Sequence, residues 1–281
     1  MSGFSSIKEA AASHILLAAH RGIAGGNIPC NTIAAFEIAL RQGTDIMELD
    51  VQKSSDGEFF VFHEGQEPNH LSAYKDFIKL NPAEAIKYQR YINVDRNATQ
   101  FGVNTLDKTL EYLKGKCYIN LDHCWHFFPE VVKVVRRHKM EDQILLKSAA
   151  KPQFIDAIEE CAPDIAFMPI AKEVDDCFDM LQSKNINFIG TEVVFAKMDS
   201  ELATEAYVEK MHKAGKVVWV NSLIYRYTAQ LAGGMSDDLS LTGDPADGWG
   251  KLSDIGYDII QSDWVGMCKD YLIGAGKYYR K

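Results

Sequence analysis

From residue 105 onward, short apolar runs alternate with amphipathic stretches of about ten residues. The runs of strand length are 117–121, 143–147, 165–169, 187–191, 217–220 and 257–261, and the helical stretches are 105–114, 129–139, 152–161, 174–184, 201–214 and 265–274. Strands that alternate with helices in this way form a parallel sheet, because each helix carries the chain back along the sheet. Three earlier apolar runs bring the count to nine. The pattern therefore predicts an α/β fold closed into a (β/α)8 TIM-type barrel, with one strand irregular or outside it.

The length of the chain, 281 residues, fits one such barrel, which commonly takes about 250 residues. No linker divides the sequence, so we expect one domain over 1–281. Residues 65–104, after the third strand, are polar and irregular, and we expect a small insertion with short helices at 73–80 and 82–89 that acts as a lid. The glycine- and aspartate-rich segment 225–250 is expected to form a second lid or a disordered tip.

Charge and composition exclude several classes of partner. The net charge of −9 gives no basic surface for a nucleic acid, and no apolar run approaches the roughly 18 residues of a membrane span. The start lacks a basic stretch that leads into a long apolar core, which favours a cytoplasmic protein, although a chain trimmed of its signal would look the same. The six cysteines show no disulfide-like spacing, so we interpret them as free thiols in a reducing compartment. Nothing in the sequence indicates an oligomeric state.

Polar residues gather at the ends of the first three strands. The first strand runs into His20-Arg21, the second carries Glu48 and Asp50, and the third ends in His63. Residues two apart on a strand point to one face, so both carboxylates aim the same way. In a barrel of this kind the active site lies at the carboxyl ends of the strands. Paired carboxylates suit a hard cation such as Mg²⁺ or Ca²⁺, and histidines exchange protons near neutral pH.

The order of these motifs resembles the glycerophosphodiester phosphodiesterase family. The matching motifs are His20-Arg21-Gly22, Pro29-Cys30-Asn31-Thr32 with Ala35-Phe36, Glu48-Leu49-Asp50-Val51, Asp56-Gly57 and Val61-Phe62-His63-Glu64. The resemblance covers about the first quarter of the chain firmly and the rest weakly. It implies a barrel of the phospholipase C-like phosphodiesterase type. It also implies metal-dependent cleavage of a small-molecule glycerophosphodiester to glycerol 3-phosphate and an alcohol, with Mg²⁺ or Ca²⁺ as the divalent cation.

The resemblance also implies roles for individual residues. Glu48 and Asp50 would hold the metal with Asp122, which stands where the family carries a glutamate in a motif like N-I-E-x-K. His20 and His63 would form the acid–base pair. The guanidinium of Arg21 would bind the phosphate through two parallel hydrogen bonds; the alternative for Arg21 is a salt bridge to Glu48 or Asp50.

Further substrate contacts are expected from strands later in the chain. Cys124 replaces the family lysine, and Lys147 at the end of the next strand would supply the missing positive charge. Glu192 follows a strand and would contact the ligand. Trp219 would pack on the substrate alcohol or, as an alternative, in the core.

Departures from the family motifs keep other functions open. Cys30 stands in place of the usual glutamate of P-E-N-T, and His63-Glu64 replaces H-D. A non-catalytic phosphodiester-binding protein therefore stays an alternative, as does a glycoside hydrolase, which requires carboxylates on different strands and no metal. The cluster 122–126 contains zinc-type ligands but matches no regular zinc spacing. Gly25-Gly26 lacks the pattern of a dinucleotide site.

Overall fold

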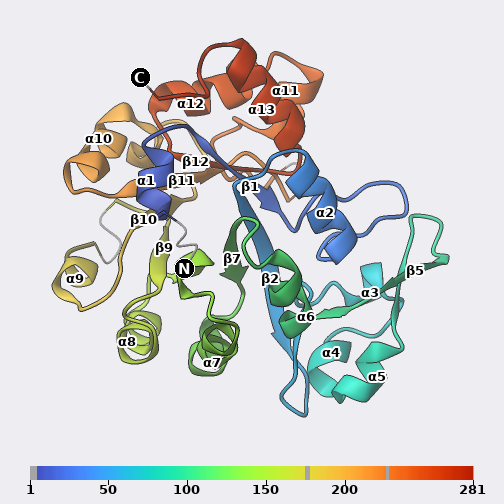
Figure 1. The fold of residues 1–281 in the computed structure, drawn as a ribbon. Helices are drawn as coiled ribbons and strands as arrows, with labels where there is room; N and C mark the ends of the chain where they lie inside the picture. Colours follow the sequence, from blue (N-terminus) through green and yellow to red (C-terminus); the bar gives the residue numbers. More distant parts are fainter. Residues whose placement is uncertain (1–4, 175–177, 226–227, 281) are drawn as a thin grey trace.

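The computed structural model describes residues 5–174, 178–225 and 228–280. In this part of the chain, eight parallel strands form a closed barrel in the order β1-β12-β11-β10-β9-β8-β7-β2, and β1 pairs with β2 to complete it (Figure 1). The barrel strands are β1 (Leu16–His20), β2 (Ile46–Lys53), β7 (Tyr118–Asp122), β8 (Ile144–Ala149), β9 (Ala166–Ala171), β10 (Gly190–Val193), β11 (Val217–Asn221) and β12 (Ile259–Ser262). The predicted barrel is confirmed.

Alternation along the strands decides which side chains face the barrel interior. Leu16 and Ala18 of β1 belong to an inner core together with Ile46 of β2, whereas Leu17 and Ala19 pack into the larger core beneath the helices. Because side chains alternate with period two, the residues that follow Ile46 on the same face are Glu48 and Asp50. The same alternation that fills the barrel therefore directs both carboxylates toward its interior at the carboxyl end.

Helices surround the barrel, and one of them closes its lower end. Helix α1 (Ile7–Ala11) lies across the amino ends of the strands, where its Ile7 and Ala11 join the inner core (Figure 1). The other helices that follow barrel strands are α2 (Ile33–Arg41), α6 (Leu106–Leu113), α7 (Phe128–His138), α8 (Pro152–Cys161), α9 (Phe178–Ser183), α10 (Glu205–Lys213), α12 (Lys251–Ile255) and α13 (Val265–Gly274). Residues 175–177 of the predicted helix 174–184 lie outside the described residues.

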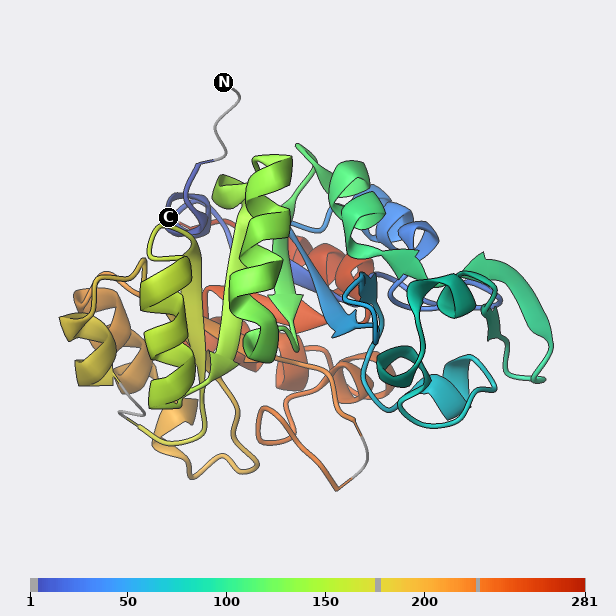
Figure 2. The same cartoon turned by 90° about the horizontal axis from the view of Figure 1, so that it is seen from below.

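The ninth predicted strand, β3 (Phe59–Val61), lies outside the barrel and runs antiparallel to β2. It opens the insertion, which stands to one side of the barrel (Figure 2). The elements of the insertion are α3 (Glu67–His70), α4 (Phe77–Leu80), α5 (Ala83–Lys87), β4 (Arg90–Ile92), β5 (Ala98–Gly102) and β6 (Asn104–Thr105). The sequence predicted the two helices α4 and α5 but not α3 or the β4–β5 hairpin. A small core that includes Phe62, Ile78 and Tyr91 fixes the insertion as an ordered unit.

The segment expected to be a second lid or a disordered tip is folded where it is described. It forms helix α11 (Asp237–Thr242) and a π-helical turn (Ala246–Gly250). The Asp237 carboxylate is buried and accepts hydrogen bonds from Ser222 Oγ (2.6 Å) and Trp249 Nε1 (2.7 Å). Buried polar side chains are satisfied in this way in stable structures, so the polar composition of the segment reflects an internal network. Residues 226–227 lie outside the described residues.

Two further expectations concern the covalent state and the environment of the chain. Cys30, Cys117, Cys124, Cys161 and Cys268 are free thiols, as expected. Cys177 lies outside the described residues. Within the described ranges, no helix has both the length and the apolar character that crossing a membrane requires.

Candidate active site

Three carboxylates meet at the carboxyl end of the barrel. Glu48 and Asp50 come from β2 and Asp122 ends β7, with Asp50 and Asp122 directly opposite each other in the parallel register. Oxygen atoms of the three groups lie within 4.8 Å of one another, and Glu48 and Asp50 are buried. The structure thus brings together the three residues that the sequence proposed as metal ligands.

The charges of this cluster are only partly compensated. Burial raises the pKa of Glu48 well above its ordinary value, and the neighbouring Asp50 and Asp122 carboxylates raise it further. Burial also opposes ionisation of Asp50, but Arg21, the imidazoles of His63 and His123 and the hydrogen bond from Asn31 together outweigh it and lower the pKa of Asp50. Carboxylates held this close together disfavour one another's charge unless a cation lies among them. Three converging carboxylates therefore fit a hard divalent cation.

Hydrogen bonds fix the orientation of the carboxylates. Asn31 Nδ2 donates to Asp50 Oδ2 (2.7 Å), and Arg21 Nε forms an ion pair with the same oxygen (2.9 Å). The backbone N–H of Arg21 donates to Glu48 Oε2 (2.9 Å). Gly22 has a φ of +73°, and a Cβ there would lie 2.8 Å from the Ala35 backbone carbon, which explains the glycine of the His-Arg-Gly motif. Asn31 was not predicted at the site, although the motif Pro29-Cys30-Asn31-Thr32 was the available signal.

His20 ends β1 opposite Glu48 of β2. Its Nδ1 lies 2.8 Å from Asp263 Oδ1, while its Nε2 is buried and has no hydrogen-bond partner within the described part of the chain. The Asp263 carboxylate accepts this hydrogen bond, so Nδ1 carries a proton and the contact fixes the orientation of the ring. Sequence reasoning missed Asp263. Its position directly after the last strand, at a barrel end where functional residues gather, was the available signal.

His63 follows β3 and lies near Asp50. Its Nδ1 is 2.8 Å from the Glu64 carbonyl oxygen, which can only accept, so Nδ1 carries the proton and Nε2 carries a lone pair. Burial lowers the pKa of His63, and the positive charge of Arg21 adds to this effect, while Asp50 acts in the opposite direction. His63 is therefore neutral at pH 7.

The other predicted substrate contacts form a buried group inside the barrel close to the carboxylates. Lys147 is buried, and its Nζ lies 2.5 Å from Glu192 Oε2 and 4.0 Å from the centre of the Trp219 ring. Asn221 Nδ2 donates to Glu192 Oε1 (2.7 Å), and the indole N–H of Trp219 donates to Asn221 Oδ1 (3.0 Å). Lys147, Glu192 and Trp219 are thus satisfied by one another, and direct contact with substrate stays a prediction for all three.

The two cysteines that replace charged family residues carry no charge in this environment. Burial raises the pKa of Cys30 to about 11, so its thiol is protonated at neutral pH. Burial also raises the pKa of Cys124 well above its ordinary value, and its Sγ donates to the Leu121 carbonyl (3.3 Å). Arg21 is therefore the predicted phosphate-binding cation that lies beside the carboxylate cluster.

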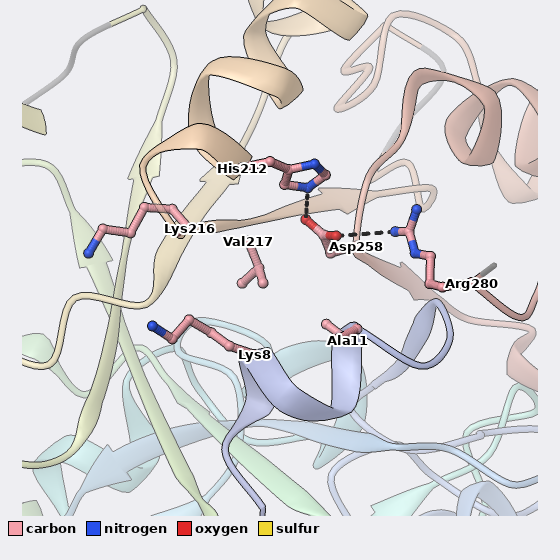
Figure 3. Close-up of a pocket in the computed structure, with 9 residues that line it drawn as sticks. Lys8, Ala11, His212, Lys216, Val217, Asp258 and Arg280 are labelled. Carbon is pink, nitrogen blue, oxygen red and sulfur yellow. Dashed lines mark hydrogen bonds and ion pairs between the residues drawn. The ribbon is translucent and has the colours of Figure 1, made fainter.

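Two hollows, each of about 380 Å³, flank the cluster at the barrel mouth. One is lined by His20, Arg21 and Cys30 with His70 from the insertion, and the other by Gln52 and His123 among others. A third hollow, of about 410 Å³, lies at the opposite end of the barrel beside α1 (Figure 3). The insertion contributes residues to both mouth hollows, so it is placed to shape what enters there.

Comparisons with known proteins agree with this architecture. Residues 167–272 match a family model described as a domain of unknown function. In sequence, the chain is 29% identical over 143 residues to a glycerophosphodiester phosphodiesterase of Caldanaerobacter subterraneus subsp. tengcongensis, which covers 47% of this chain and 57% of that protein. The chain spans little more than half the length of the first curated relatives that it matches.

Similarity in fold extends over nearly the whole chain. A glycerophosphoryl diester phosphodiesterase of Parabacteroides distasonis superposes with a TM-score of 0.77 at 16% identity, covering 97% of this chain and 93% of that one. An Oleispira antarctica phosphodiesterase in complex with the product sn-glycerol-3-phosphate gives 0.66 at 20% identity, covering 96% and 100%. At these identities the structural matches establish a shared fold.

Proposed function

We propose that this chain, a relative of the glycerophosphodiester phosphodiesterases in sequence over part of its length and in fold over nearly all of it, hydrolyses glycerophosphodiesters. The products would be glycerol 3-phosphate and an alcohol. The observation that carries the proposal is the convergence of Glu48, Asp50 and Asp122 at the barrel mouth, with the imidazoles of His20 and His63 beside them. The Oleispira relative that holds glycerol 3-phosphate supports the same substrate class.

Glu48, Asp50 and Asp122 would hold one divalent cation, for which Mg²⁺ and Ca²⁺ are the candidates. When bound, the cation supplies positive charge to the phosphate oxygens as negative charge develops on them. Arg21 neutralises the same oxygens from the other side of Asp50. Its ion pair with Asp50 holds the guanidinium in place before substrate arrives.

The partners of the two histidines suggest how the proton transfers are divided. The Asp263 carboxylate holds His20 Nδ1 and leaves Nε2 unpaired, so His20 would donate a proton from Nε2 to the leaving alcohol oxygen. His63 faces a neutral carbonyl and keeps a lone pair on Nε2, so it would take the proton from the attacking hydroxyl. The attacking group would be the glycerol 2-hydroxyl of the substrate, and its bond to phosphorus forms as the bond from phosphorus to the leaving alcohol breaks. A water molecule would then open the resulting cyclic phosphate to give glycerol 3-phosphate.

The decisive experiment follows release of glycerol 3-phosphate from glycerophosphocholine by EDTA-treated protein, with and without added Mg²⁺ or Ca²⁺, alongside bis-p-nitrophenyl phosphate as a general diester. We expect activity that returns with the metal. Asp122→Asn should need a higher metal concentration, because it removes one ligand charge. If no metal restores turnover of either diester, the proposal is wrong.

One observation favours a second candidate, a protein that binds phosphodiesters without cleaving them. Cys30 and Cys124 supply no charge, and Lys147 is already paired with Glu192, so the mouth holds fewer cations than the family motifs imply. Binding of glycerophosphocholine without turnover would support this candidate. The glycoside hydrolase alternative finds less support, since two of the three carboxylates share one strand face and do not flank a bond from opposite sides.

A further inference from the structure

A second group of metal-ligand atoms lies beside the carboxylate cluster and shares one residue with it. The group consists of Asp50, His63 and His123, whose ligand atoms all lie within 4.8 Å of one another. His123 Nε2 is 3.9 Å from Asp50 Oδ1, and the two imidazole rings are 4.6 Å apart between centres. The three residues come from β2, the segment after β3 and the segment after β7, so the fold assembles the group from distant parts of the chain.

Two of the three ligands are already prepared to bind a cation. The contact of His63 Nδ1 with the Glu64 carbonyl leaves the Nε2 lone pair available, which is the usual arrangement of a metal-binding histidine. Asp50 Oδ2 is held by Arg21 and Asn31, whereas Asp50 Oδ1 is buried and has no hydrogen-bond partner within the described residues. Since Asp50 is only 1% exposed, an unpaired carboxylate oxygen at this place is costly unless a cation lies against it, and a cation in either group of ligands would do so.

The third ligand, His123, is held by the turn that follows β7. Its backbone lies in the left-handed region with a φ of 55°, and its N–H donates to Asp122 Oδ1 (2.8 Å). Its ring also packs against Trp125, with 4.9 Å between ring centres. Asp122 and His123 are neighbours in sequence, yet this turn brings one to the carboxylate cluster and the other to the nitrogen-containing group.

The donor atoms of the two groups select different metals. Three carboxylates suit a hard cation such as Mg²⁺ or Ca²⁺, whereas two imidazoles and one carboxylate with an open position form a common donor set for Zn²⁺. We propose that Asp50, His63 and His123 form a zinc site, and that zinc bound there inhibits the enzyme. The inhibitory part rests on the proposed phosphodiesterase function; the binding part does not.

The reason for inhibition is the shared use of His63. A metal on His63 Nε2 occupies the lone pair that would take the proton from the attacking hydroxyl. Zinc would therefore block proton transfer even when the three carboxylates hold their own cation. Asp50 contributes to both groups, so zinc also changes the charge that this residue presents to the neighbouring site.

Metal binding can be measured without any assay of activity. We would titrate metal-free protein with Zn²⁺ by calorimetry and with Co²⁺, whose visible absorption bands report nitrogen ligands and coordination geometry. The test variant is His123→Asn, because asparagine tolerates the left-handed backbone at this position and lacks the imidazole. The matched control is His126→Asn, an exposed histidine three residues further on that belongs to neither group.

We expect His123→Asn to weaken binding of Zn²⁺ and Co²⁺ by at least about tenfold, the smaller loss seen when even an outer partner of a metal ligand is removed. The control should bind as the parent does. Equal affinity and equal Co²⁺ spectra for the parent and His123→Asn would overturn the proposed site.

The inhibitory part is tested with Mg²⁺ or Ca²⁺ present in excess. Added Zn²⁺ should inhibit the parent and the His126→Asn control, while His123→Asn, compared with its own zinc-free rate, should need at least about tenfold more zinc. Equal inhibition of all three proteins, or activation by zinc, would overturn it. A parent without activity under any condition would contradict the phosphodiesterase function, and the calorimetry and Co²⁺ spectra would still decide the zinc site.

Discussion

The two ends of the barrel treat their polar side chains in opposite ways. At the mouth, His20 Nε2, Asp50 Oδ1 and both amide atoms of Gln52 are buried without hydrogen-bond partners among the described residues. At the lower end, Asp258 accepts from Val218 N–H (2.7 Å), His212 Nε2 (2.9 Å) and Arg280 (3.1 Å) (Figure 3). At the lower end, these polar groups form hydrogen bonds and ion pairs with one another, and these contacts stabilise the fold.

The backbone shows a weaker form of the same contrast. Arg21, Asn31 and His123, all at the mouth, adopt left-handed φ values that residues other than glycine seldom adopt, whereas Lys139 does so at the lower end. Each such residue costs about 1–3 kcal/mol, a cost that persists where the surrounding structure requires it. The unpaired polar groups and left-handed residues of the mouth therefore reduce the stability of the fold but leave groups available to bind a ligand. Substitutions at the two ends should therefore separate activity from stability.

The largest effect is expected at His20. Replacement with alanine removes the proposed proton donor, and we expect kcat to fall by about 10²- to 10⁴-fold with little change in Tm. His14→Ala provides the control, because His14 pairs with Asp45 at the lower end (3.0 Å). It should lower Tm and leave kcat unchanged. A His20→Ala protein with near-parent turnover would break the assignment of the mouth as the reactive end.

A smaller effect on activity is expected for Asp263→Asn, which keeps the shape but removes the charge beside His20. Loss of the charged acceptor weakens the hydrogen bond that orients the His20 ring, so kcat/KM should fall by about tenfold or more. An unchanged kcat/KM would indicate that Asp263 supports only the local structure.

At the lower end, Asp258→Asn should affect stability alone. Asp258 is buried, and removal of its charge weakens its contacts with the Val218 N–H, with His212 and with Arg280. We expect a loss of about 1–3 kcal/mol in the free energy of unfolding, measured by urea denaturation. Turnover at a temperature where the variant is folded should match the parent. A large loss of kcat in folded Asp258→Asn would show that the two ends are coupled.

The smallest effect is a pH dependence of stability at His212. Its hydrogen bond to Asp258 raises its pKa, against the opposing effects of partial burial and of Arg280, and with a small contribution from Glu209. A raised folded-state pKa contributes stability that is complete below the unfolded value of about 6.5 and is lost as pH rises through the folded value.

His212→Gln should therefore be less stable than the parent near pH 6, and the difference should vanish at higher pH. Because His212 is partly exposed, we expect less than about 1 kcal/mol. A difference that stays constant between pH 6 and pH 9 would contradict this account.

Much of the fold and of the carboxylate cluster follows from local sequence pattern. The period-two alternation of β2 determines that Glu48 and Asp50 share a face, and the rule that barrel sites lie at strand ends adds Asp122. Contacts between residues that are distant in the sequence could not be predicted from local pattern. The pairing of Lys147 with Glu192 depends on two strands that are not adjacent in the sheet, β8 and β10.

His123 shows a different limit of sequence reasoning. No linear spacing connects it with Asp50 and His63, and its place depends on a single left-handed residue in the turn after β7. Residues 122–126 match no linear zinc-binding motif. The structure separates these residues, with Cys124 buried and His126 exposed, and only His123 joins the new group.

The buried group of Lys147, Glu192, Asn221 and Trp219 has a consequence for ligand access. These side chains bond to one another inside the barrel and fill its interior beside the carboxylates. We therefore expect any molecule that binds the carboxylate cluster to arrive and depart on the side of the two mouth hollows.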